Sequence, residues 1–174
     1  ALLTAVDNGT QSALMVPTEI LAEQHYLNIR LYCEKLGIEI KLVTSALKGK
    51  ERQVYFEEIQ SGKTKIVVGT HSLIQKDIKF KKLGLVVIDE QHRFGVMQRE
   101  AIGKKGDQPH LLIMTATPIP RSLALTLYGD MDVSLLDESP PGRQEIMTNL
   151  FFENQREQAY SIMENSYNKA GRLF

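Results

Sequence analysis

The sequence has 174 residues, of which 43% are hydrophobic and 24% are charged. This composition is typical of a soluble globular domain with a hydrophobic core, and it excludes a low-complexity or fibrous chain. The formal net charge is zero, so a bound polyanion would be held by local groups and not by a general positive field. The one cysteine, Cys33, excludes an internal disulfide and predicts a reducing cytoplasm. No apolar run is long enough to span a bilayer, so we expect no membrane partner.

Both ends of the sequence resemble incomplete elements. Residues 1–6 resemble the last turns of a helix, which Asn8 and Gly9 end. Residues 172–174 resemble the first residues of an apolar strand. We therefore expect that the chain is a piece of a longer protein.

Short apolar runs alternate with helical patterns along most of the chain. We expect strands at residues 12–16, 38–42, 66–69, 85–88 and 111–114. We expect helices at residues 19–36, 49–60 and 121–128, a helical turn at 70–74 and a weakly helical stretch at 96–105. In the first helix, Ile20, Leu27 and Leu31 fall on one apolar stripe. The alternation predicts an α/β fold in which helices cover both faces of a parallel sheet.

The last third of the chain has a different pattern. We expect a final strand at residues 132–136 and a linker at 137–143, where two prolines and a glycine follow one another closely. A strand at 147–152 and a helix at 154–169 would begin a second unit.

The most informative stretch is residues 85–90. Leu85–Ile88 is a fully apolar run and predicts a strand buried on both faces. Asp89 and Glu90 follow it directly, and nucleotidases with a P-loop place the aspartate that holds magnesium at the end of such a strand. The alternative is that Asp89 only caps the helix that follows.

Polar or small residues also follow three other expected strands. They are Pro17 and Thr18, then Gly69, Thr70 and His71, and then Thr115, Ala116 and Thr117. Because parallel strands end at the same edge of a sheet, we expect all these groups to lie on one rim with Asp89 and Glu90. Thr18 and Thr70 could also be ordinary helix caps, and the two roles are compatible.

Four strings of residues resemble the motifs of superfamily 2 helicases, in the same order. They are PTEILAEQH at 17–25, GTHSLIQ at 69–75, DEQHRFGV at 89–96 and TATPIPR at 115–121. The combination is similar to the RecG family of branch-migrating DNA helicases. Gln91 favours this family over the transcription-repair coupling translocases, which share the later motifs. A non-catalytic module that binds nucleic acid or protein is a further alternative.

The resemblance implies a RecA-like P-loop NTPase fold that uses ATP and Mg²⁺ and acts on branched or forked DNA. Residues 1–136 would be the first motor domain without its P-loop strand, 137–146 the interdomain linker and 147–174 the start of the second motor domain. The phosphate-binding loop would lie before Ala1, so we expect the chain alone to be inactive. We expect the full-length parent to be a monomer.

The resemblance also implies roles for individual residues. Asp89 would hold Mg²⁺ through water, and Glu90 would activate the attacking water. Gln91 and His92 would sense the γ-phosphate. The residues implied to couple ATP to DNA are Arg93, Thr115, Ala116 and Thr117. The residues implied to contact the DNA backbone are Pro17, Thr18, Gly69, Thr70 and His71.

Overall fold

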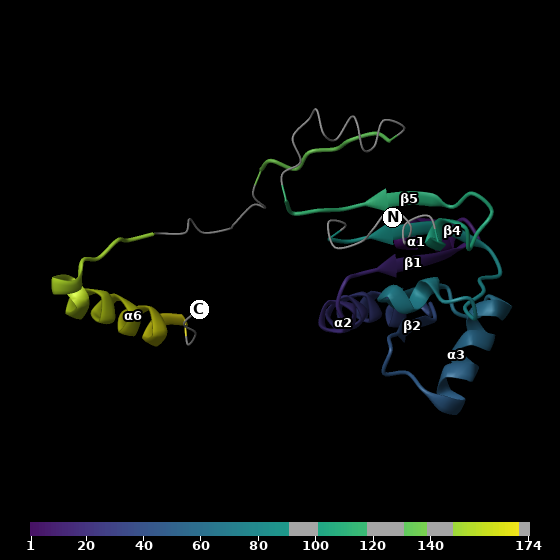
Figure 1. Cartoon of the computed structure of the whole chain (residues 1–174), viewed down its shortest axis with the longest axis horizontal. Coiled ribbons are helices and arrows are strands. Elements are labelled where there is room, and N and C mark those ends of the chain that lie inside the picture. Colours follow the sequence, from purple (N-terminus) through teal and green to yellow (C-terminus); the bar gives the residue numbers. More distant parts are fainter. Residues whose placement is uncertain (91–100, 118–130, 139–147, 171–174) are drawn as a thin grey trace. The chain divides into compact units, whose positions relative to one another are not determined.

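The computed structural model describes residues 1–90, 101–117, 131–138 and 148–170, with side chains described as far as residue 165. The chain divides into two compact units, Ala1–Leu127 and Tyr128–Phe174, and each is described by itself (Figure 1).

The first unit is built on a five-stranded sheet in the order β2-β3-β1-β4-β5. All four neighbouring pairs are parallel, which confirms the predicted fold class. The strands are β1 (Gln11–Met15), β2 (Ile40–Val43), β3 (Ile66–Gly69), β4 (Leu83–Ile88) and β5 (His110–Ile113).

The helices of this unit follow the predicted order. They are α1 (Leu2–Asp7), α2 (Glu19–Leu36), α3 (Gly49–Ser61) and the 3₁₀ turn η1 (His71–Ile74). The bounds of α2 agree with the prediction because both ends are capped. The Thr18 side chain accepts a hydrogen bond from the Leu21 amide at 3.3 Å, and Gly37 ends the helix with φ +65°.

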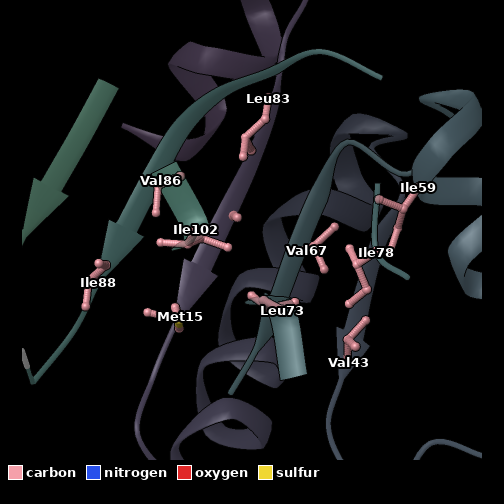
Figure 2. Close-up of a cluster of buried hydrophobic side chains, with 11 residues drawn as sticks. Met15, Val43, Ile59, Val67, Leu73, Ile78, Leu83, Val86, Ile88 and Ile102 are labelled. Atoms are coloured by element: carbon pink, nitrogen blue, oxygen red, sulfur yellow. The ribbon is translucent and has the colours of Figure 1, made fainter. Parts of the chain in front are cut away.

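Alternate residues of the strands form two hydrophobic clusters, one on each face of the sheet. On one face, Met15, Val67 and Val86 pack with Ile59 of α3 and Leu73 of η1 (Figure 2). On the other face, the cluster is Leu14, Val16, Ile40, Ile66, Val68 and Val87 with Ala22 and Cys33 of α2, and Leu2 and Val6 of α1 pack against it. Strands β1 to β4 are therefore covered on both faces, as the sequence predicts for a parallel sheet, whereas neither cluster contains a residue of β5.

The predicted burial of Leu111–Met114 is wrong for the part of the chain that the structure describes. Leu111, Leu112 and Met114 are 36%, 40% and 37% exposed. The reason is the position of β5 in the sheet. Among the described strands β5 pairs with β4 alone, so this apolar run lies at the border of the sheet although its composition resembles that of a central strand.

The apolar stripe predicted on α2 does not face the hydrophobic core. Ile20, Leu27 and Leu31 are exposed, whereas Ala22 and Cys33 are buried against the sheet. Helix α2 has apolar residues on more than one side, and the connection from β1 decides which side faces the core. Periodicity alone cannot make that choice.

The second unit contains a short 3₁₀ turn, η3 (Glu153–Gln155), followed by α6 (Arg156–Ala170), which confirms the helix predicted at 154–169. The strands predicted at 132–136 and 147–152 are wrong where the structure describes them, since residues 131–138 and 148–152 are neither helix nor strand. A strand needs a partner, and no described residue pairs with these segments. The helix at 121–128 and most of the predicted linker lie outside the described residues.

Among the described helices, none has the length and apolar character that crossing a membrane would require.

Candidate nucleotide and nucleic-acid site

The carboxyl ends of the strands meet at one edge of the sheet, as the sequence predicts. The Asp89 amide donates to the Met15 carbonyl at 3.0 Å, and the Met114 amide donates to the Ile88 carbonyl at 2.8 Å. These bonds continue the ladder just past the ends of β1, β4 and β5. The residues that follow the three strands therefore leave the sheet side by side.

Asp89 lies at the centre of this rim and is fixed from two directions. Its Oδ1 atom accepts a hydrogen bond from the Glu90 amide at 2.9 Å. Its Oδ2 atom lies 3.1 Å from Nε2 of His25. The side chain keeps 22% of its surface exposed, so the carboxylate is oriented and still reaches solvent.

Glu90 has an unusual backbone conformation. Its φ is +52°, in the left-handed region that residues other than glycine seldom adopt. Such strain is found preferentially at functional sites, where the surrounding structure maintains it. Glu90 therefore has a strained backbone directly after Asp89, which is consistent with a functional role for the acidic pair.

The two threonines expected at the rim both act as helix caps. Thr18 caps α2, and Thr70 caps η1, with its Oγ1 atom 3.5 Å from the Ser72 amide and 3.2 Å from the Ser72 hydroxyl. Thr70 is only 1% exposed, whereas the neighbouring His71 is exposed. The side chain in this turn that a ligand can reach is therefore His71.

The remaining predicted coupling residues are partly described. Thr115 and Thr117 lie after β5, with their hydroxyl oxygens 2.8 Å apart, and Ala116 between them is exposed. Gln91, His92 and Arg93 lie outside the described residues.

Two contacts at the rim were not predicted from the sequence. His25 of α2 reaches Asp89, and Glu19 accepts hydrogen bonds from the Ser45 hydroxyl at 2.6 Å and from its amide at 3.0 Å. The hydrogen bond from the Ser45 hydroxyl is the main cause that lowers the pKa of the Glu19 carboxyl. A signal for His25 was available, because it follows Thr18 by two helical turns and so lies on the same side of α2.

A Gly-Lys-Thr tripeptide occurs at residues 62–64, but its position excludes a phosphate-binding loop. A phosphate loop follows a strand and opens a helix, whereas Gly62 ends α3 with φ +78° and β3 follows it. Lys63 binds Glu58 at 2.5 Å, and Thr64 is buried. The tripeptide is therefore a helix-ending turn on the opposite edge of the sheet.

The donor set at the rim fits magnesium held together with a nucleotide. No cluster of three or more potential metal ligands occurs among the described residues. These residues therefore do not form a metal site in which the protein supplies every ligand. Mg²⁺ usually keeps several waters and binds one or two carboxylates plus substrate phosphates. Asp89 matches this pattern, since each of its oxygens has one protein partner and can accept a further hydrogen bond from metal-bound water.

Gly69 permits a close approach of strands at the rim. A Cβ atom at this position would lie 2.3 Å from the Val43 carbonyl oxygen and 2.9 Å from Cδ2 of Leu73. We expect Gly69→Ala to lower the free energy of unfolding of the chain by about 1–3 kcal/mol, because the overlap includes backbone that cannot move aside. Urea unfolding measures the change.

Gly103→Ala is the matched control for this substitution. Among the described residues, and apart from its own chain neighbours, no residue has an atom within 4 Å of a Cβ built on Gly103, and the φ of Gly103 is not positive. We expect its stability to be unchanged or slightly raised, because alanine favours a helical backbone. Equal stability of the two variants would contradict the close approach at Gly69.

A family model described as DEAD/DEAH box helicase matches residues 1–126. The chain belongs to the DEAD/DEAH box helicase family. Within this helicase family, the chain is similar to curated proteins named ATP-dependent DNA helicase RecG. The relative from Aquifex aeolicus is 47% identical over 174 residues, which cover 99% of this chain and 22% of that protein. The relative from Haemophilus influenzae is 51% identical and covers 95% of this chain and 24% of that protein.

A solved structure of RecG agrees with this assignment, and a second solved structure shares the fold alone. A structure of RecG bound to a three-way DNA junction is 41% identical with a TM-score of 0.76, over 97% of this chain and 23% of that chain. The C-terminal domain of Dbp5 from S. cerevisiae is 17% identical with a TM-score of 0.54, over 75% of this chain and 78% of that chain, and shows likeness of fold alone. The resemblance to RecG-type helicases is confirmed, and the chain spans about a quarter of the length of these relatives or less.

Proposed function

We propose that the chain is part of the motor of an ATP-dependent DNA helicase that remodels branched or forked DNA. The observation on which this rests is the placement of Asp89 and Glu90 on one rim with the residues that follow β1, β3 and β5. The family assignment and the similarity to RecG along the chain support it. In this proposal, residues 1–136 belong to the first motor domain, 137–146 are the linker and 147–174 begin the second motor domain.

ATP hydrolysis would use the acidic pair. Asp89 would hold Mg²⁺ through water, and the metal would supply positive charge at the phosphates. Glu90 would orient the attacking water and accept its proton. Gln91 and His92 would respond to the γ-phosphate, and Arg93 with residues 115–117 would link that response to DNA.

DNA would lie along the same rim, beside the start of α2 and the turn after β3. Pro17 and Thr18 lie at the amino end of an 18-residue helix, where free backbone N–H groups suit phosphate oxygens. In the turn formed by Gly69, Thr70 and His71, the exposed His71 side chain would make the contact. Contacts of this kind bind the backbone without reading the base sequence, as translocation requires.

The other proposals concern the setting of the full-length protein. The buried free thiol of Cys33 is compatible with a reducing compartment, and we place the protein in the cytoplasm. We propose a monomeric parent.

The test is ATP turnover by the full-length protein that contains this chain, measured with Mg²⁺ and with forked DNA, linear duplex or no DNA. We expect forked DNA to stimulate turnover most. We expect the 174-residue chain alone to show no magnesium-dependent turnover above background.

Other results would select the alternatives. Equal stimulation by linear duplex together with binding of RNA polymerase would favour a transcription-repair coupling translocase. DNA binding without turnover by the full-length protein would indicate a non-catalytic module. Turnover by the isolated chain would contradict the expectation that it is incomplete.

A further inference from the structure

The contact between His25 and Asp89 joins α2 to the acidic pair. The Nε2 atom of His25 lies 3.1 Å from Oδ2 of Asp89, and the two side chains are 32% and 22% exposed. Because a carboxylate only accepts hydrogen bonds, Nε2 must hold the hydrogen in this contact. With the Glu90 amide on Oδ1, each oxygen of Asp89 has its own donor. His25 therefore sets the orientation of the carboxylate from the side of α2.

The same helix is tied to two other loops of the rim. Thr18 caps α2 where the chain leaves β1, and Glu19 of its first turn binds Ser45, just after β2. From Thr18 to His25 is two turns of continuous helix, about 10 Å. The start of α2 thus connects the ends of β1, β2 and β4 through one rigid element.

We propose that His25 is a positioning residue that orients Asp89 for magnesium and transmits nucleic-acid binding at the start of α2 to the acidic pair. This inference rests on the proposed function, in which Asp89 serves ATP and the start of α2 serves DNA. A strand bound at Thr18 shifts or fixes the first turn of α2, and His25 passes that change to the Asp89 carboxylate. Among the described residues, the hydrogen bond of His25 is the one that joins α2 to Asp89.

The experiment compares His25→Ala and His25→Gln in the full-length protein that contains the chain. The Gln side chain places an amide N–H near the position of Nε2, so it can still donate to Asp89. The measurements are ATP turnover against Mg²⁺ concentration with and without forked DNA, binding of ATP with Mg²⁺ and with chelator, and the thermal midpoint.

We expect His25→Ala to raise the Mg²⁺ concentration for half-maximal turnover about 10-fold, as loss of a partner that orients a metal ligand typically does. The Mg²⁺-dependent part of ATP binding weakens by a similar factor, and forked DNA stimulates turnover less. ATP binding with chelator and the thermal midpoint stay at wild-type values. His25→Gln restores most of the magnesium response.

Asn28→Ala is the control, because Asn28 is exposed on the same helix. A wild-type magnesium response in His25→Ala overturns the inference. Equal losses in the Ala and Gln variants, accompanied by a lower thermal midpoint, also overturn it, since they show a structural role only. If the wild-type protein has no DNA-stimulated turnover, the proposed function fails, and the magnesium dependence of ATP binding still decides the role of His25.

Discussion

Replacement of Glu90 by glutamine in the full-length protein is expected to abolish ATP turnover and to leave ATP binding intact. Glutamine has the same shape as glutamate but cannot accept the proton of the attacking water. Loss of a general base typically lowers the rate by about 10²–10⁴-fold. Single-turnover hydrolysis and equilibrium binding of ATP measure the two effects separately.

Glu57→Gln provides the control for charge and composition. Glu57 is exposed on α3, where it binds Gln53. We expect its turnover to equal that of the wild-type protein. Persistent turnover in Glu90→Gln would show that another group activates the water, and the assignment of Glu90 would be wrong.

The largest expected loss of stability follows from Gln11→Met. Gln11 is 2% exposed and makes four hydrogen bonds to backbone groups. Its amide nitrogen donates to the carbonyls of Ile59 and Thr64, both at 2.8 Å. Its amide oxygen accepts from the amides of Lys81 and Lys82, at 2.8 and 3.0 Å. Methionine keeps the volume but leaves these groups without their partner, so we expect a loss of about 2–6 kcal/mol in the free energy of unfolding.

The neighbouring Ser12 offers a matched control. Ser12 is also fully buried, but its hydroxyl has no hydrogen-bond partner among the described residues. We expect Ser12→Ala to leave the free energy of unfolding unchanged or to raise it slightly, because it removes a buried hydroxyl group that forms no hydrogen bond with a described residue. Urea unfolding of both variants of the chain provides the comparison. Similar losses at the two positions would show that burial, and not the four bonds of Gln11, determines the cost.

The parts of the fold that could be predicted are those that short stretches of sequence encode. Helix α2 has a threonine cap at one end and a glycine at the other, so its bounds were predicted correctly. The rim was predicted because parallel strands must end at one edge, and this needs only the alternation of strands and helices.

The parts that failed depend on which elements become neighbours. Leu111 and Leu112 have the composition of a buried strand, but the sheet order places β5 at an edge. Ile20 and Leu31 fall on a stripe, but the packing of α2 buries another side. The contact of His25 with Asp89 joins positions 64 residues apart, so no local pattern contains it.

The central place of β1 has a consequence for biosynthesis. The strand is translated before β3 and β4, yet it pairs with both of them, so that Ser12 lies beside Ile66 and Leu85. During translation β1 therefore stays unpaired until both β3 and β4 have emerged from the ribosome. Contacts so distant along the chain form slowly, and an unpaired apolar strand in the meantime is a target for aggregation. Slow translation or chaperone binding to β1 would therefore influence the yield of folded protein.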